Sequence, residues 1–295
     1  MNYIDNIKII KNIQTIKSEL ESLKSLKIKK DFILLIATYD YLKYTNNLLH
    51  SYYRNNTVSK KIFVFTIDSK KNSKKNILPP NLEYDANHYE IIIKNNSSKH
   101  IKSISANIRF HLIDILIPYS KSILYLDSDS IILKDLTKMY HHFSNYSIAL
   151  RKHTNHRNGR TNHYYPLKSG LIYVKNDKLG REFISYAIKD IKSNLQIWYA
   201  DQKAISYAYF KISFSKISKV LLFNSRFFDW NLYPEPYIFS AKGVKKNTLG
   251  FIYFSKIIGY KRNIFLKFFY FLFILIETLI RIFFKRCKKF FSKIW

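Results

Sequence analysis

Apolar side chains change their spacing twice along the chain, which divides it into three regions. Over residues 1–30 they recur every three or four positions, at Ile9, Ile13, Ile16, Leu20 and Leu23, with Lys and Glu between them. This period predicts an N-terminal amphipathic helix. The heptad seam is shorter than a coiled coil needs, so a helix packed on the domain and an oligomerisation helix both remain open.

From Asp31 to residue 262, short apolar runs alternate with stretches of helical period. Buried strands are predicted at FILLIA, KIFVFTID, YEIIIK, ILYL, IALR and GLIYVK. Helices are predicted at YTNNLLHSYYRNN and SANIRFHLIDILIP. Fully apolar strands alternating with helices indicate an α/β domain whose parallel or mixed sheet has helices on both faces.

The last region, 263–295, is rich in Phe, Leu and Ile, and its charges follow one stripe at three- and four-residue spacing. Its longest uncharged run ends well short of the ~20 residues that span a bilayer. The pattern favours a helix lying in the membrane interface, although a spanning helix and a core-packing helix are alternatives. The expected membrane contacts are Phe268, Phe269, Phe273, Lys285, Arg286, Lys288 and Lys289.

The charge of the chain narrows the class of partner. It has 50 Lys and Arg against 20 Asp and Glu, a formal net charge of +30. This excess suits nucleic acid, an anionic membrane surface or a phosphorylated substrate. The single Cys excludes an internal disulfide, and MNYIDNIKIIKNIQ lacks the apolar stretch of a signal peptide, so we expect a cytoplasmic location. Six glycines and no G-x-G-x-x-G argue against a Gly-rich phosphate loop.

Two acids interrupt the apolar sequence LYLDSDSIIL at its centre. Asp127 and Asp129 follow the predicted strand ILYL, at the sheet edge where ligands bind in open α/β folds. Residues i and i+2 of a strand face the same side, so both carboxylates are expected to converge on one Mg²⁺ or Mn²⁺. A solvated turn is the alternative, as is a general acid/base couple, which needs carboxyls ~5 Å or more apart across a sugar.

Around this pair, the segment RFHLIDILIPYSKSILYLDSDSIILKDLTKMY resembles the metal-binding core of family 8 glycosyltransferases, above all the bacterial lipopolysaccharide galactosyl- and glucosyltransferases. Further segments that resemble the family follow its order: IATYDYLKY, PLKSGLIYVKN, YADQKAIS and FNSRF. The resemblance spans roughly residues 31–261. It implies a GT-A (Rossmann-like) mixed sheet with flanking helices and a retaining hexosyltransferase that uses a nucleotide sugar, most often a UDP-sugar.

The resemblance also implies roles for single residues. Asp127 and Asp129 would hold Mn²⁺ or Mg²⁺, while Asp201 and Gln202 would lie near the anomeric carbon, with Gln202 stabilising an oxocarbenium-like state. The implied donor-binding residues are Ala37, Thr38, Asp40, Arg109, Ser128, Lys168, Ser169, Gly170, Gly259 and Lys261. From the residues alone, the less favoured alternative for Arg109 is a surface helix charge, and the alternative for Asp201 is an acid stabilised at a helix start.

Two positions depart from the family pattern. Tyr253 stands where the family has a His as third metal ligand, and no His follows His163, so Asp229 or diphosphate and water would have to complete the site. Lys168 stands where an Asn commonly contacts the donor sugar, so the sugar is not assigned. The insert RKHTNHRNGRTNHYY at 151–165 is expected to be either a basic loop over the diphosphate or acceptor, or a solvated loop.

Together these features predict a peripheral enzyme on the cytoplasmic face of a bacterial inner membrane. Its expected acceptor is a lipopolysaccharide or another lipid-linked glycan, with a protein or wall polymer as the alternative. A tail that binds anionic lipid would raise the enzyme concentration beside such an acceptor. A nucleic-acid-binding protein is the rival from another class, but no nucleic-acid module is recognisable, and the basic cluster adjoins an apolar tail.

Overall fold

The computed structural model describes most of the central region of the chain. The described residues are 30–56, 60–68, 86–92, 98–152, 166–212, 214–224, 226–229 and 236–240, with single helical positions between 272 and 283. The predicted N-terminal helix, the basic insert after Lys152, Tyr253, Gly259 and Lys261 lie outside these residues. So do Phe268, Phe269 and the basic cluster at 285–289.

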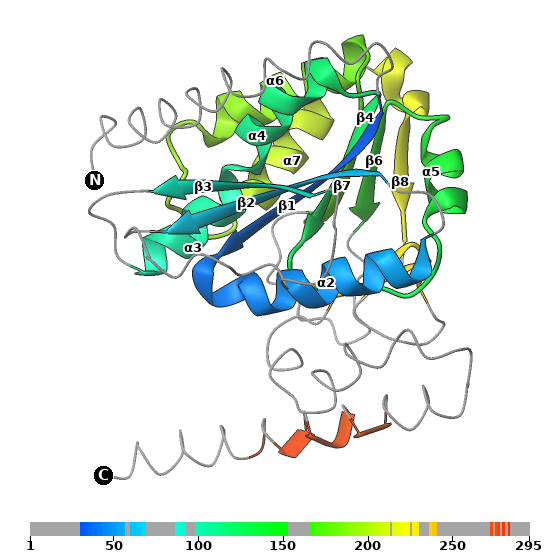
Figure 1. Ribbon diagram of the computed structural model, residues 1–295. Helices are drawn as coiled ribbons and strands as arrows, with labels where there is room; N and C mark the ends of the chain where they lie inside the picture. Colours follow the sequence, from blue (N-terminus) through cyan, green and yellow to red (C-terminus); the bar gives the residue numbers. More distant parts are fainter. Residues whose placement is uncertain are drawn as a thin grey trace.

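The centre of the protein is a seven-stranded mixed sheet in the order β3-β2-β1-β4-β7-β6-β8 (Figure 1). Its strands are β1 (Asp31–Thr38), β2 (Lys61–Asp68), β3 (Ala86–Ile92), β4 (Ser122–Asp127), β6 (Ile148–Lys152), β7 (Leu167–Lys175) and β8 (Val220–Phe223). Strands β3, β2, β1 and β4 are parallel, and β7 runs antiparallel to both β4 and β6. The predicted mixed α/β sheet is confirmed.

Helices cover both faces of this sheet. The helices are α2 (Leu42–Asn55), α3 (Ser98–Asn107), α4 (Arg109–Leu116), α5 (Thr137–Phe143), α6 (Lys178–Ile191) and α7 (Ala200–Lys211). In Figure 1, α4, α6 and α7 lie on one side of the sheet and α2 on the other. Phe32, Leu34 and Ile36 of β1 belong to the core with α3, α4, α6 and α7, whereas Ile33 and Leu35 belong to the core with α2 and α5. Burial on both faces explains why β1 is apolar throughout.

A small second sheet lies beside the end of β4. It has the order β5-β10-β9, built from β5 (Ser130–Ile132), β9 (Phe228–Asp229) and β10 (Ile238–Ser240). Three short 3₁₀ turns complete the elements: η2 (Tyr39–Tyr41), η3 (Ile117–Tyr119) and η4 (Phe214–Lys219). The chain therefore leaves the large sheet at Asp127 and enters the small one at Ser130, which fixes the segment between them at both ends.

The helix predicted over SANIRFHLIDILIP is two helices, α3 and α4, that meet at Ile108. Ile108 keeps helical angles, and the amide N–H of Leu112 still donates to the carbonyl of Ile108. The two helices therefore follow each other closely, and their junction presents Asn107 and Arg109, both buried.

The described positions of the tail are helical and expose apolar side chains. Phe273, one of the expected membrane contacts, is among them, and Phe283 is 63% exposed. The exposed apolar residues at these positions are Leu272, Phe273, Leu275, Ile276, Leu279, Ile280 and Phe283. Within the described ranges, no helix has both the length and the apolar character to cross a membrane.

Candidate active site

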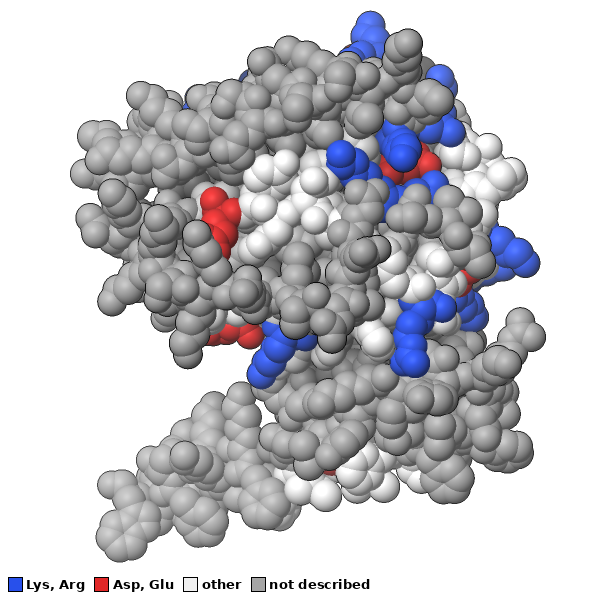
Figure 2. Space-filling model, in the orientation of Figure 1, with Lys and Arg blue, Asp and Glu red and all other residues white. Residues whose placement is uncertain are grey.

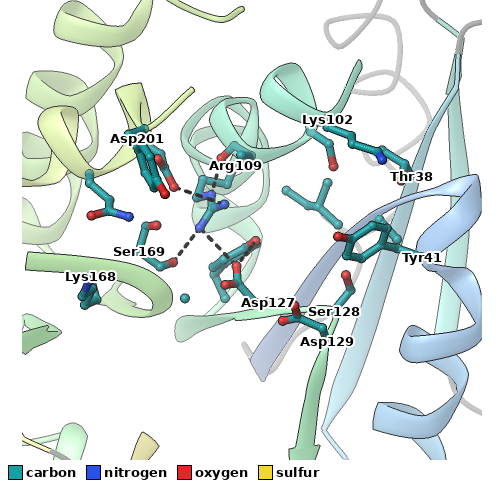
Figure 3. Close-up of a pocket in the computed structure, with 18 of the residues that line it drawn as sticks. Thr38, Tyr41, Lys102, Arg109, Asp127, Ser128, Asp129, Lys168, Ser169 and Asp201 are labelled. Carbon is teal, nitrogen blue, oxygen red and sulfur yellow. Dashed lines mark hydrogen bonds and ion pairs between the residues drawn. The ribbon is translucent and has the colours of Figure 1, made fainter. Parts of the chain in front are cut away.

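A cavity of about 450 Å³ opens beyond the carboxyl ends of β1 and β4. The chain runs from β1 to β2 and β3 on one side, then returns to β4 on the other, so the strand order reverses between β1 and β4. Such a switch point leaves a crevice at the carboxyl ends, because the connecting segments diverge there. The cavity is lined from β1, α3, β4, β7 and the start of α7 (Figure 3).

Arg109, at the start of α4, contacts residues of four of these elements. Its Nη1 lies 3.4 Å from Oδ1 of Asp127, and its Nη2 lies 3.4 Å from Oδ2 of Asp201. Nη1 also donates to the Ser169 carbonyl at 2.5 Å, and Nε donates to the Ala106 carbonyl (Figure 3). The Arg109 side chain is only 4% exposed, which rules out a surface helix charge. One buried guanidinium thus pairs with two acids from β4 and α7.

Tyr125 supports the same array from within β4. It lies two residues before Asp127, hence on the same side of the strand, and its hydroxyl donates to Oδ1 of Asp127 at 3.0 Å. The guanidinium carbon of Arg109 lies 4.3 Å from the centre of the Tyr125 ring, a cation–π distance. Asp127 is therefore oriented by a phenol and a guanidinium.

The guanidinium of Arg109 stays charged and the phenol of Tyr125 stays neutral over a wide pH range. Burial opposes the charged form of Arg109, but Tyr125, Asp201 and Asp127 outweigh it, and the pKa of Arg109 lies above its ordinary value. Burial likewise raises the pKa of Tyr125 well above its ordinary range, so Tyr125 stays a neutral donor. The array is therefore built around a fixed cation.

Asp129 reaches the cavity in a different way from the one predicted. The strand ends at Asp127, and Ser128 and Asp129 form a turn before β5, so the alternation of a pleated strand does not place the second carboxylate. The turn forms because Ser130 pairs with Ser240 in the small sheet. Oδ1 of Asp129 accepts a hydrogen bond from the Ser240 hydroxyl at 3.5 Å, and both acids and Ser128 line the cavity.

Gly170 makes room beside the first carboxylate. A Cβ at this position of β7 would lie 2.8 Å from Oδ2 of Asp127 and 2.9 Å from Cζ of Phe228. Arg109 and Tyr125 both contact the other oxygen of Asp127, Oδ1. The space next to Oδ2 exists because residue 170 has no side chain.

The lining also fits a divalent cation in its chemistry. Two carboxylates, Asp127 and Asp129, line one cavity, and oxygen donors are the ligands that Mg²⁺ and Mn²⁺ prefer. Among the side chains that the structure describes, no group of three His, Cys, Asp or Glu is arranged to hold an ion. A site built on these two acids would need further oxygen ligands.

The opposite part of the lining comes from the end of β1. Ala37 and Thr38 line the cavity as expected, and Tyr41 of η2 does so in the position predicted for Asp40. Asp40 is exposed and is not part of the lining. The hydroxyl of Thr38 is buried and has no hydrogen-bond partner among the described residues, so it is available to a ligand.

Asp201 and Gln202 enter the cavity from the first turn of α7. Asp201 is buried and paired with Arg109, so it is both an acid at a helix start and part of the array. Its backbone N–H donates to Oδ1 of Asn107 at 3.0 Å, which ties α7 to the junction of α3 and α4. Lys168 and Ser169 of β7 complete the predicted lining.

The structure thus brings together residues predicted from five separate segments of sequence. Several lining residues were not predicted, because they have no charge pattern of their own: Ile36, Tyr41, Lys102, Ser105, Ala106, Tyr125, Trp198, Tyr199 and Phe228. The aromatic pair was the one visible indication among them, because Tyr199 begins the quoted segment YADQKAIS and Trp198 directly precedes it. Of Asp229, the alternative third ligand, the structure describes only the backbone in β9.

No protein-family model and no curated protein sequence matches the chain. Solved structures do. The galactosyltransferase LgtC in complex with donor and acceptor sugar analogs superposes with a TM-score of 0.52 at 15% identity, covering 78% of this chain and 95% of LgtC. The glycosyltransferase GlyE of Streptococcus pneumoniae TIGR4 superposes with a TM-score of 0.50 at 14% identity, covering 84% of this chain and 62% of GlyE. The chain therefore shares the GT-A fold of these structures.

Proposed function

We propose that this protein is a metal-dependent, retaining glycosyltransferase, similar to family 8, that moves a hexose from a nucleotide sugar to a glycan acceptor. The main support is the array Asp127–Arg109–Asp201 in one cavity at the strand switch point. One part of such a cavity offers acids for a metal-bound diphosphate. Another part offers a fixed cation and an amide for a sugar. The shared fold with LgtC and GlyE is a second support.

The donor would lie across the cavity from β1 to α7. The Thr38 hydroxyl and the Tyr41 ring suit a ribose and a base, because a phenol ring stacks on any base and a buried hydroxyl seeks a partner. We propose UDP as the nucleotide on the resemblance described above. Asp127 and Asp129 would hold Mn²⁺ or Mg²⁺, which when bound neutralises charge on the departing diphosphate.

The transferred sugar would lie between Arg109 and the start of α7. Arg109 is charged and immobilised, so its N–H groups are pre-organised for sugar hydroxyls or phosphate oxygens. Gln202 lines the cavity beside Asp201, and its amide oxygen would stabilise positive charge at the anomeric carbon rather than form a bond to it. The charge of Lys168 would influence which donor sugar the cavity binds.

The acceptor and the location of the enzyme are proposed from the tail. Seven apolar side chains on its described helical positions are exposed, and the basic cluster follows in sequence. This combination suits the surface of an anionic membrane, so we propose a lipid-linked glycan, of the lipopolysaccharide type, as acceptor at the cytoplasmic face of a bacterial inner membrane. The cavity itself argues against nucleic acid, because three acids line it: Asp127, Asp129 and Asp201.

The proposal is tested by donor hydrolysis with the purified full chain. A panel of UDP-, GDP- and dTDP-sugars is incubated with Mn²⁺ or Mg²⁺, and released nucleoside diphosphate is measured. We expect turnover of at least one UDP-sugar, abolished by EDTA and restored by excess Mn²⁺. A chain that hydrolyses no nucleotide sugar but binds oligonucleotides would contradict the proposal and favour the nucleic-acid class.

A further inference from the structure

Three large apolar residues stand in a row at the edge of the cavity, just before α7. Ile197, Trp198 and Tyr199 are 55%, 55% and 50% exposed, and the last two line the cavity. The rings of Trp198 and Tyr199 meet edge to face with their centres 5.4 Å apart. Large aromatic side chains left exposed beside a polar cavity mark interaction sites, because burying them against a ligand is favourable.

The backbone beneath these rings is held in place by one buried side chain. The amide nitrogen of Asn107 donates to the carbonyls of Leu195 at 2.7 Å and Ile197 at 2.8 Å. Its amide oxygen accepts from the N–H of Asp201 at 3.0 Å. Asn107 is fully buried at the junction of α3 and α4, so the segment 195–201 is fixed from within at three points.

Tyr199 adds a second sign of constraint. Its φ is 67°, in the left-handed region, and no other described residue except glycine has a positive φ. A residue with a side chain is strained in this conformation, because its Cβ lies too close to the following carbonyl oxygen. Strained residues of this kind cluster at ligand-binding sites, where the surrounding structure enforces them. Here the strain and the Asn107 bonds together present two rings to solvent in a fixed geometry.

The position of the rings indicates what they would contact. They immediately precede Asp201 and Gln202, the residues proposed to border the transferred sugar, whereas Thr38 and Tyr41 lie at the β1 part of the lining. A group on Trp198 and Tyr199 would therefore lie next to the donor sugar and away from the nucleotide. A pyranose ring suits such a surface, since it has an apolar C–H face for an aromatic ring and hydroxyls at its edge for the Tyr199 phenol.

We propose that Trp198 and Tyr199 form a stacking subsite for a pyranose ring of the acceptor. This inference rests on the proposed function for the identity of the ligand, and its test can fail separately. Pre-organised rings favour such stacking. The loop is already ordered before the sugar arrives, so binding loses little conformational entropy. Trp198 is the better residue to test, since its exposed side chain makes no hydrogen bond to the described residues and its removal should leave the fold unchanged.

The test uses the full-length protein and the substitution Trp198→Ala, with Phe210→Ala as matched control. Phe210 is an aromatic residue of α7 that is 69% exposed and does not line the cavity. Methyl β-galactoside, methyl β-glucoside and lactose are titrated in the presence of UDP and Mn²⁺. Intrinsic fluorescence is followed in the wild type and in Trp198→Phe, so that the difference isolates Trp198 from Trp230 and Trp295.

We expect at least one saccharide to change the Trp198 emission, and Trp198→Ala to weaken its binding by roughly tenfold, measured by calorimetry, which corresponds to about 1.4 kcal/mol. Transfer to that saccharide should fall by a similar factor, through a higher acceptor KM. Phe210→Ala should change none of these quantities.

Equal saccharide binding in Trp198→Ala and the wild type, or no response of the Trp198 emission to any of the three, would overturn the subsite. So would dissociation of a dimer by Trp198→Ala in sedimentation velocity without any effect on saccharide binding, because the rings would then cover a second copy of the chain. If the protein hydrolyses no nucleotide sugar, the proposed function fails, yet the fluorescence titration still decides whether the rings bind a sugar.

Discussion

At the scale of single residues, the chemistry of the cavity depends on charged side chains that are held in fixed positions. Arg109 is buried between Asp127 and Asp201, and its pKa is raised by these neighbours, so the guanidinium remains a cation at any working pH. A buried charge that lost its partner would be costly, so each member of the array stabilises the placement of the others. The array therefore orients the carboxylate of Asp127 toward the space left by Gly170.

Gly170→Ala tests that space. The new methyl group would meet Oδ2 of Asp127 at 2.8 Å, so the carboxylate or Phe228 must move. We expect Mn²⁺-dependent UDP binding to weaken at least tenfold, and overpacking to cost about 1–3 kcal/mol of unfolding free energy. Calorimetry and thermal unfolding measure the two effects.

The control is Val174→Ala, which removes a buried side chain from the same strand, β7, away from the cavity lining. It should lower the unfolding free energy while UDP affinity stays at the wild-type level. If Gly170→Ala binds UDP as tightly as the wild type, the space beside Oδ2 has no role in binding.

The role of a residue could be predicted from sequence only where its side chain suits few kinds of chemistry. The acids of LYLDSDS indicated a cation site from their spacing, and both line the cavity. Their geometry was not predictable in the same way, because strand alternation predicts Asp129 on a continued strand, whereas the turn before β5 places it. The pairing of Ser130 with Ser240 that makes this turn joins residues far apart in the sequence.

At the scale of elements, the segment 195–201 and the junction of α3 and α4 form one unit. The Asn107 side-chain amide connects them across about ninety residues of sequence. It donates two hydrogen bonds to the segment and accepts a third from it. This unit places Asp201, Trp198 and Tyr199 together at the start of α7. It acts through backbone geometry, so Asn107 is a positioning residue.

Asn107→Ala tests the unit. It leaves buried carbonyls and an N–H without partners, so we expect a loss of about 1–3 kcal/mol in unfolding free energy, with Tm lower by roughly 2–4 °C for each kcal/mol. Hydrogen exchange should accelerate in peptides covering 194–203.

Asn176→Ala is the matched control, because the amide of Asn176 donates to the Ser120 carbonyl at the far end of β4. It should leave exchange in 194–203 unchanged. Unaltered exchange in Asn107→Ala would mean that other contacts hold the segment.

Elements were predictable where apolar runs are long. β1 and β2 lie where FILLIA and KIFVFTID predict them, because strands buried on both faces are apolar at every position. β3 begins at Ala86, three residues before the predicted YEIIIK, where the alternation of ANHYE is half polar. The small sheet was not predicted, since strands of two or three residues have too few positions to show a period.

At the scale of the whole molecule, basic character is a surface property. Figure 2 shows Lys and Arg at several separate places on the described part of one face, with few acids between them. The acids of the cavity, by contrast, are buried or half-buried. This distribution is consistent with the proposed approach to an anionic surface and with the proposed metal site in a sheltered acidic cavity.

Truncation after Lys261 tests the proposed attachment to membranes. The full chain should sediment with vesicles of phosphatidylglycerol and phosphatidylethanolamine, because basic residues contribute roughly 1 kcal/mol each beside an anionic leaflet and the apolar residues insert. The truncated chain should stay in the supernatant and keep its donor hydrolysis. Continued sedimentation of the truncated chain would locate the membrane contact elsewhere.

The central claim is that Asp127 and Asp129 hold a divalent cation that binds the diphosphate of a nucleotide. Titration calorimetry of UDP into the wild type and into Asp127→Asn/Asp129→Asn, with Mn²⁺ and with EDTA, tests it most directly. We predict UDP binding to the wild type only with Mn²⁺, and none to the double variant, whose thermal unfolding remains cooperative. Equal UDP affinity in both proteins, or equal affinity with and without Mn²⁺, would contradict the account.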